Sequence, residues 1–212
     1  MKMDITFNLK ERNGYCGNAN IVFDEKYALE NVQLKSTPDR TGFYVVTPEI
    51  QSKNGVKELF HPVSSNVRTN YFDTAIIKAY HNAKEGNKTT TIENDLPPMA
   101  VSLVRTSKYE NGSIVGLANV GFSQSYMIEG VQIKVSQDGH EYLSMPTYRQ
   151  PELQNGRPVY DENGKPKMKY RDVFKPITRE AYDEIRNAVV STFYQQHKSQ
   201  GISESPYESP RR

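Results

Sequence analysis

An internal repeat constrains the fold of this chain more than any other feature of its sequence. Residues 19–35 read ANIVFDEKYALENVQLK and residues 118–134 read ANVGFSQSYMIEGVQIK, so eight positions are identical at an offset of 99 residues. Further markers recur in the same order, among them Phe60-His61-Pro62, which is matched by Phe174-Lys175-Pro176. A fixed period of this kind indicates two copies of one supersecondary unit, each about 80–95 residues long.

The repeat and the composition around it divide the 212 residues into four parts. The first unit spans residues 1–86 and the second spans residues 99–198. Residues 87–98 are polar, rich in threonine and closed by two prolines, which predicts a linker. Residues 199–212 hold few apolar side chains that could offset the entropy lost on ordering, so we expect a disordered tail.

Each unit is predicted to begin with strands. In the first unit Ile5, Phe7 and Leu9 alternate with polar residues, which is the period of a half-buried strand. Asn13-Gly14 then suits the positive φ angles of a tight hairpin turn, and a second strand is expected over residues 15–23.

The remaining strands of the first unit are expected at residues 29–34, 43–47 and 56–60, and a helix follows them. Ser64 is a suitable N-cap for this helix, as Thr178 is in the second unit. The apolar residues of the first helix recur at helical spacing: Val67, Tyr71, Ala75, Ile76, Ala79 and Tyr80.

The predicted fold class is therefore α+β, with an antiparallel sheet of about five strands and one C-terminal helix in each unit. A sheet covered by one helix leaves an edge that can pair with another strand. We expect the two units to pack as an intrachain pseudo-dimer.

The two units differ most between their fourth and fifth strands. The repeat offset is 98 residues before this point and 114 after it, so the second unit carries 16 extra residues here. They form a predicted arm over residues 147–171, and long excursions of this kind are usually functional or disordered. Lys165, Lys167, Lys169 and Arg171 alternate along its returning strand, which predicts one row of cations on one face.

The composition excludes several classes of protein. The chain holds 27 Lys plus Arg against 25 Asp plus Glu, so its overall charge of +2 does not by itself indicate a nucleic-acid partner. No apolar run approaches the roughly 18 residues of a membrane span, and the N-terminus lacks an apolar signal-peptide core. One cysteine and four scattered histidines provide neither a disulfide nor a metal cluster. We expect a cytoplasmic protein without membrane contact or cofactor.

Residues 42–68, GFYVVTPEIQSKNGVKELFHPVSSNVR, resemble the second half of SpoVG, a small bacterial regulator of septation and sporulation. The order of elements, together with Pro48, His61-Pro62 and Arg68, carries the resemblance, and the second unit holds counterparts of these segments. The chain departs from the family by holding two copies. It also has Glu49 where a basic residue is usual in the family.

The resemblance implies a homodimer that binds DNA or RNA as a regulator, without catalysis. In this chain the two units would replace the two subunits, and a further homo-oligomer stays open. The cations that we assign to binding of nucleic acid or another partner lie in the hairpins and on the helices: Lys53, Lys57, Arg68, Arg149, Arg157, Lys165, Lys167, Lys169, Arg171 and Arg179.

No residue pattern supports an enzyme. His61 has no catalytic partner near it in the sequence, and its counterpart in the second unit is Lys175. Two functions stay open. The first is a non-catalytic DNA- or RNA-binding regulator, which the resemblance favours. The second is a module that binds a protein or small ligand, such as an inhibitor or sequestering protein from a mobile element, which the small net charge favours.

Overall fold

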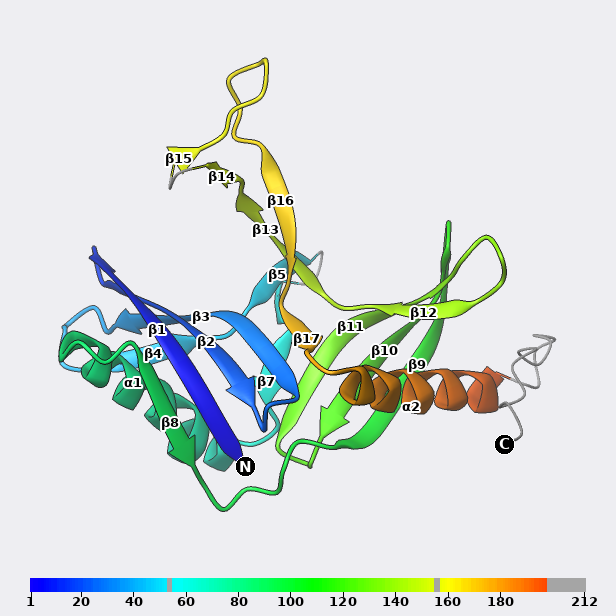
Figure 1. Cartoon of the computed structure of the whole chain (residues 1–212), viewed down its shortest axis with the longest axis horizontal. Helices are drawn as coiled ribbons and strands as arrows, with labels where there is room; N and C mark the ends of the chain where they lie inside the picture. Colours follow the sequence, from blue (N-terminus) through cyan, green and yellow to red (C-terminus); the bar gives the residue numbers. More distant parts are fainter. Residues whose placement is uncertain (53–54, 155–156, 198–212) are drawn as a thin grey trace.

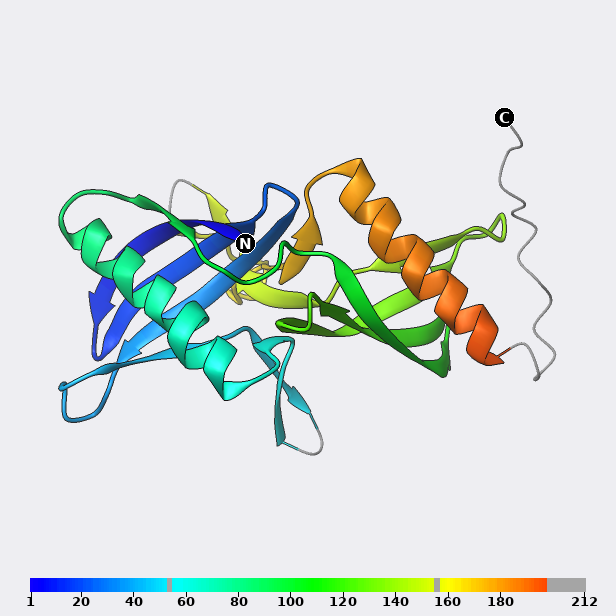
Figure 2. The same ribbon diagram turned by 90° about the horizontal axis from the view of Figure 1, so that it is seen from below.

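The computed structural model describes residues 1–52, 55–154 and 157–197. They form an α+β structure with two large antiparallel sheets (Figure 1). The first sheet has the strand order β17-β3-β2-β1-β8, with β4 also paired to β3, and the second has the order β12-β11-β10-β9, with β7 also paired to β11. A helix covers one face of each sheet, as the view from below shows (Figure 2). The expected fold class is confirmed.

We call residues 1–98 the first half and residues 99–197 the second half. The strands of the first half are β1 Lys2–Arg12, β2 Tyr15–Phe23, β3 Tyr27–Ser36, β4 Phe43–Val46, β5 Glu49–Ser52, β6 Gly55–Glu58, β7 Phe60–Pro62 and β8 Thr89–Glu93. Those of the second half are β9 Val101–Asn111, β10 Ile114–Phe122, β11 Tyr126–Val135, β12 Glu141–Ser144, β13 Thr147–Pro151, β14 Leu153–Gln154, β15 Arg157–Pro158, β16 Met168–Asp172 and β17 Phe174–Pro176. The helical segments are η1 Val67–Asp73, which is π-helical, α1 Thr74–Lys84 and α2 Arg179–His197.

The first hairpin follows its sequence pattern. Ile5 and Phe7 are buried under α1 and Thr6 between them is exposed, whereas Leu9, the third apolar residue of the pattern, is 44% exposed. Asn13 and Gly14 have φ angles of 50° and 82°, so the predicted tight turn is confirmed. The second strand covers residues 15–23 as expected.

The two sheets are joined by an exchange of short strands. β7 of the first half pairs with β11, where Phe60 lies opposite Ile128. β17 of the second half pairs with β3, where Phe174 lies opposite Leu29. The paired residues of the two sites are related by the offsets of the sequence repeat, 114 for the phenylalanines and 99 for their partners.

The prediction of one continuous strand over residues 56–60 is wrong. The chain breaks at Leu59 into β6, which pairs with β5 in a small separate hairpin, and β7, which enters the other sheet. The break lets β7 leave the hairpin, so that the Phe60 side chain is buried in the cluster of aromatic rings between the sheets.

This cluster consists of seven fully buried rings whose neighbouring centroids lie 5.1–6.0 Å apart, four from the first half and three from the second. Its members are Phe23, Tyr27, Phe60, Phe72, Phe122, Tyr126 and Phe174. Buried rings at these spacings attract one another beyond the burial of their apolar area. The cluster is continuous with the buried residues under both helices, so one hydrophobic core runs through both halves.

The predicted linker, residues 87–98, is partly a strand. β8 pairs along β1, from Lys2 opposite Glu93 to Thr6 opposite Thr89, and extends the first sheet by one strand. Among the described residues, β9 has no such neighbour in the second half and pairs only with β10. The predicted tail, residues 199–212, lies outside the described residues.

Both predicted N-caps are confirmed. Ser64 Oγ accepts the backbone N–H of Val67 at 3.2 Å, and Thr178 Oγ1 accepts that of Ala181 at 3.1 Å. The expected apolar stripe of the first helix is buried as predicted except at one position. Phe72 is buried and Tyr71 only half-buried, because the π-helical turn brings side chains five residues apart onto one face.

Two tyrosines at matching places in the repeat differ in one hydrogen bond. Tyr27 Oη donates to Glu184 Oε2 at 2.9 Å, whereas the buried Tyr126 Oη has no hydrogen-bond partner among the described residues. We expect Tyr27→Phe to destabilise the protein by about 1 kcal/mol and Tyr126→Phe to be neutral or to stabilise it by about 1 kcal/mol. Urea unfolding of both variants measures this. An equal loss in the two variants would contradict it.

Candidate nucleic-acid interface

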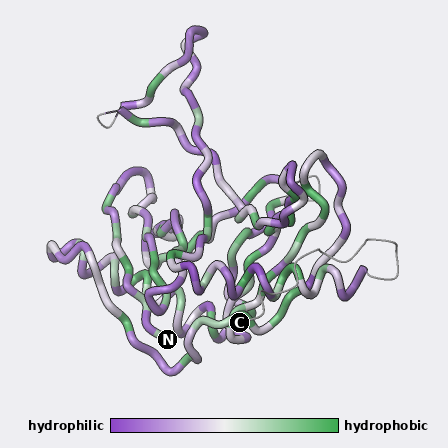
Figure 3. The backbone as a smooth tube through the Cα atoms, turned by 45° about the vertical axis from the view of Figure 1, so that its right-hand side comes forward, coloured by the Kyte–Doolittle hydropathy of each residue, from purple (hydrophilic) through white to green (hydrophobic). Residues whose placement is uncertain are grey.

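The predicted arm is an extended hairpin that rises away from both sheets (Figure 1). Its base is the pairing of β13 with β16, from Thr147 opposite Asp172 to Pro151 opposite Met168, and β14 pairs with β15 beyond it. Most of the arm is hydrophilic, in contrast to the strands of the body (Figure 3). Both helices lie on the other side of the molecule (Figure 2). The arm therefore projects on the side that the helices leave uncovered.

The predicted row of four cations lies only partly on one strand. Lys169 and Arg171 alternate on β16, but Lys165 and Lys167 precede its first residue. Pro166, which lacks an N–H, forms only an isolated bridge with the opposite side of the arm and interrupts the ladder there.

Tyr170 lies on the opposite face of β16 from Lys169 and Arg171, because successive side chains of a strand alternate between faces. It stands directly opposite Arg149 on β13, and the guanidinium carbon lies 5.6 Å from the centre of the ring. This distance allows a cation–π contact. The Tyr170 side chain is nevertheless 66% exposed, so a ring and a cation are both accessible on this face of the arm.

Electrostatics divide the candidate cations into two groups. Lys57 Nζ lies 2.8 Å from Glu129 Oε2, and Arg179 Nε lies 3.6 Å from Asp183 Oδ2. Within the described ranges, no ion pair is formed by the six cations of the arm: Arg149, Arg157, Lys165, Lys167, Lys169 and Arg171. Lys53 lies outside the described residues. Of the candidate binding cations, those of the arm can thus contact an anionic partner without breaking an internal ion pair.

Arg68 is bound within the protein. Its guanidinium reaches both carboxylate oxygens of Glu58, at 2.8 and 2.9 Å, and Thr47 Oγ1 donates to the same carboxylate at 2.6 Å. Asp73 lies close by, and its burial raises the pKa of its carboxyl, although Arg68 opposes this rise. Arg68 therefore connects β6 to η1 and has little freedom to bind an external phosphate.

His61 has a structural environment. Its Nε2 lies 3.3 Å from Glu129 Oε1, so it links β7 to the strand that β7 joins. The matching residue Lys175 links β17 to β3 in the same way, with Nζ 2.6 Å from Glu30 Oε1. This equivalence explains why a lysine can replace the histidine.

We expect His61→Gln to change the free energy of unfolding by less than about 1 kcal/mol, since the pair with Glu129 is partly exposed to solvent. Nucleic-acid binding should be unaffected. Urea unfolding and oligonucleotide titration measure the two effects. A complete loss of binding in stably folded His61→Gln would show a functional role.

Burial alone would raise the pKa of Glu129, but Lys57 and His61 outweigh it and hold this pKa below its usual value of 4.5. The stabilisation from this carboxylate is therefore present above that value and is lost as the pH falls through the lowered pKa.

The described part of the chain contains no group of three or more His, Cys, Asp or Glu side chains that could hold a metal ion. None of its helices is long and apolar enough to cross a membrane. Burial raises the pKa of the Cys16 thiol, which disfavours the reactive thiolate.

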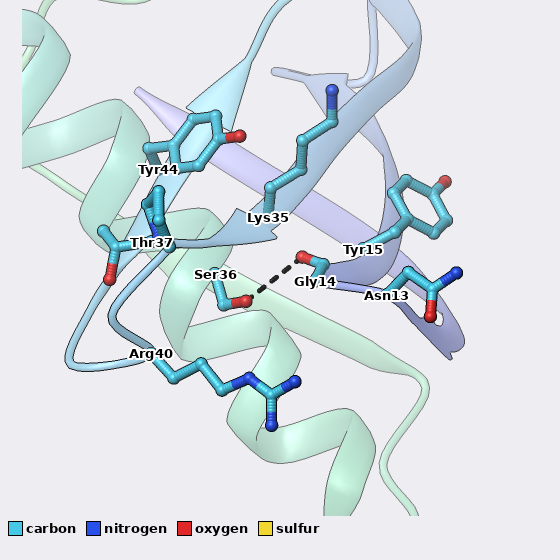
Figure 4. A pocket seen from close by; sticks show the side chains of 9 residues that line it. Asn13, Gly14, Tyr15, Lys35, Ser36, Thr37, Arg40 and Tyr44 are labelled. Atoms are coloured by element: carbon cyan, nitrogen blue, oxygen red, sulfur yellow. Dashed lines mark hydrogen bonds between the residues drawn. The ribbon is translucent and has the colours of Figure 1, made fainter.

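Sequence reasoning missed one surface feature, a pocket of about 430 Å³ at the end of the first sheet (Figure 4). Lys35, Tyr15 and Tyr44 line it and belong to three neighbouring strands. The sequence offers one indication of this pocket, because Lys35 recurs as Lys134 in the repeat. The repeat does not specify the strand register, however, so it does not predict which residues lie beside Lys35.

Comparison with known proteins agrees with the resemblance noted in the sequence. Residues 99–195 match the model of the SpoVG family. The chain is also 29% identical over 86 residues to a protein of Archaeoglobus fulgidus described as "Putative septation protein SpoVG". That alignment covers 41% of this chain and 82% of the relative. Both comparisons thus find this chain similar to the SpoVG family, the first of them through residues 99–195.

Proposed function

We propose that this protein is a non-catalytic regulator that binds DNA or RNA through the arm, residues 147–171. The observation that carries the proposal is the set of six arm cations without internal ion-pair partners. Cations on an accessible hairpin can contact successive phosphates and release their counterions. The match of residues 99–195 to the SpoVG family, and the septation role named for the archaeal relative, are consistent with a regulatory protein.

The charge of the arm is sufficient for this role although that of the whole chain is small. Residues 147–171 hold six cations against three acids, Glu152, Asp161 and Glu162. Asp161 Oδ1 accepts the backbone N–H groups of Asn163 and Lys165 at 2.9 Å, so this carboxylate is used to form the turn at the tip. The exposed rings of Tyr160 and Tyr170 add surfaces on which bases can stack.

Titration of the full chain with random-sequence single- and double-stranded oligonucleotides between 50 and 200 mM salt tests the proposal. The logarithm of the association constant should fall linearly with that of the salt concentration, by about 0.9 per phosphate contact on duplex DNA. Absence of binding, or binding that is insensitive to salt, would overturn it. In that case the second function, binding of a protein or small ligand, is tested by identifying what co-purifies with the chain.

We also propose that residues 1–86 and 99–198 are copies of one SpoVG-like unit that form a pseudo-dimer within the chain. The reciprocal pairing of β7 and β17 supports this, because each strand completes the sheet of the other half at matching positions. The aromatic cluster supports it as well, since all of its members except Phe72 fall into pairs related by the repeat.

The pseudo-dimer predicts how a separated first half behaves. In the fragment 1–98, β7 has no β11 to join, and Phe23, Tyr27 and Phe60 lose the rings of the second half. We expect this fragment to dimerise or aggregate, as measured by light scattering during gel filtration. A stable, well-folded monomer would show that the halves do not depend on each other.

A further inference from the structure

We propose that the uncovered face of the first sheet is a second binding site, which holds an unpaired segment of single-stranded nucleic acid. Bases stack on Tyr15 and Tyr44, and phosphates contact Lys35 and Arg12. The inference rests on the proposed function and deepens it, because it assigns the recognition of single strands to a surface that is separate from the arm.

The strand register places cations and rings in one row. Lys35 on β3 lies directly opposite Tyr15 on β2 and directly opposite Tyr44 on β4. Arg12 at the end of β1 lies opposite Tyr15. Residues directly opposite each other in a sheet share a face, so the row reads Arg12, Tyr15, Lys35, Tyr44 across four neighbouring strands. Figure 4 shows the side chains of Tyr15, Lys35 and Tyr44 pointing to the same side.

This row faces solvent and not the core. Leu34 and Val45, the neighbours of Lys35 and Tyr44 along their strands, are buried on the helix side of the sheet. Because successive side chains of a strand alternate between faces, the row lies on the opposite face. The Tyr44 side chain is 45% exposed.

Amide side chains form the next row on the same face. Asn18 on β2 lies opposite Asn8 on β1 and opposite Gln33 on β3. Amides both donate and accept hydrogen bonds, and unstacked bases offer both kinds of group along their edges. The face therefore combines phosphate-binding, stacking and base-edge groups.

The pocket around the row is held by backbone hydrogen bonds. The carbonyl of Gly14 accepts the Ser36 backbone N–H at 2.8 Å and the Ser36 hydroxyl at 3.3 Å, which fixes the hairpin turn beside the end of β3 (Figure 4). Among the described residues, Arg12, Lys35 and Arg40 form no ion pair. Their charges are thus available to a ligand.

Arg40 occupies a backbone position that suits glycine. Its φ angle is 61°, and its N–H is donated to the Thr37 carbonyl at 2.8 Å. In the matching loop of the second half, Gly139 has a φ angle of 84° and donates to the Ser136 carbonyl at 3.0 Å. An arginine at such a position is strained relative to glycine. Its side chain lines the pocket but points away from Tyr15, Lys35 and Tyr44, so we assign it no contact in the row (Figure 4).

The second sheet provides a natural control. There Lys134 lies opposite Ile114 and opposite Tyr142, and Ile114 lies opposite Asn111. The lysine and one tyrosine are thus kept, whereas the second ring and the second cation of the row are absent.

The test measures binding of the full chain to fluorescein-labelled ten-nucleotide oligo(dT), oligo(U) and a mixed-sequence duplex by anisotropy. We expect Tyr44→Ala to weaken single-strand binding about five-fold to a hundred-fold, the range for loss of one stacking ring, and Tyr44→Phe to keep it. Duplex binding should be unchanged. The matched control Tyr142→Ala should stay within about two-fold of the wild type for all three probes, since its row lacks the second ring.

Lys35→Ser adds a variant that removes the central cation of the row, and its folding should be preserved because Lys35 forms no ion pair among the described residues. It should weaken single-strand binding and lower the salt slope by about 0.7, the value for one contact on a single strand. Comparison of oligo(dT) with oligo(U) shows whether DNA or RNA is preferred.

The outcomes separate the two proposals. If the wild type binds none of the probes, the proposed function fails and this inference fails with it. If the wild type binds and Tyr44→Ala and Lys35→Ser leave single-strand affinity unchanged, the uncovered face is not a binding site and the arm proposal stands.

Discussion

Replacement of Phe174 by alanine is expected to lower the free energy of unfolding by about 3–5 kcal/mol. The ring is fully buried and its centroid lies 5.4–6.0 Å from those of Phe122, Tyr27 and Phe60. Its removal leaves a cavity where the two halves meet and weakens the attachment of β17 to β3. Since domains are stable by only about 5–15 kcal/mol, the loss is a large share of the total.

Urea unfolding followed by circular dichroism measures the effect. Ile177→Ala is the matched control, because this neighbouring side chain is 46% exposed and its loss should cost less than about 1 kcal/mol. Phe60→Ala should cost about as much as Phe174→Ala, and the double variant less than the sum, because the two rings contact each other. A loss below about 1 kcal/mol in Phe174→Ala would mean that the cluster does not hold the halves together.

Features that depend on a few neighbouring residues could be predicted from the sequence. The turn at Asn13-Gly14 needs only residues that tolerate positive φ, and the caps at Ser64 and Thr178 need only a hydroxyl three residues before a free N–H. Alternating burial likewise follows from the period of a strand.

Features that depend on distant pairing could not be predicted. A three-residue strand such as β7 has too few residues for a period to show which sheet accepts it. The pairing of β7 with β11 is explained by the burial of Phe60 among rings that are remote in sequence. The polar threonines of β8 predict a linker, but threonine is also a good strand former, and β8 pairs with β1.

The candidate site shows the same division. The alternating cations of the arm are visible in the sequence, but the neutralisation of Lys57 by Glu129 is not, because 72 residues separate the pair. The row of Tyr15, Lys35 and Tyr44 likewise exists only through the register of three strands. A charge pattern in the sequence can therefore identify candidate binding cations. Only the folded structure shows which of them have no internal ion-pair partner and can contact a ligand.

Replacing Lys165, Lys167, Lys169 and Arg171 together by serine is expected to weaken duplex DNA binding by about 100- to 1,000-fold at 0.1 M salt. Each phosphate contact contributes about 0.9 to the slope of log affinity against log salt, so the slope should fall by about 3–4 units. Folding should be preserved, since the four side chains lie outside the hydrophobic core and form no ion pair among the described residues. Thermal unfolding of the variant checks this.

A matched variant distinguishes the effect of the position of these cations on binding from the effect of the net charge of the protein. Lys26, Lys78, Lys88 and Arg105 are four exposed cations on the body, and their replacement by serine removes the same net charge. If only bulk attraction mattered, both quadruple variants would weaken binding equally. Because direct phosphate contacts release counterions one by one, whereas distant charges are screened over about 10 Å at 0.1 M salt, we expect the body variant to keep most of the wild-type slope. An arm variant with wild-type affinity and slope would show that the arm does not contact the nucleic acid.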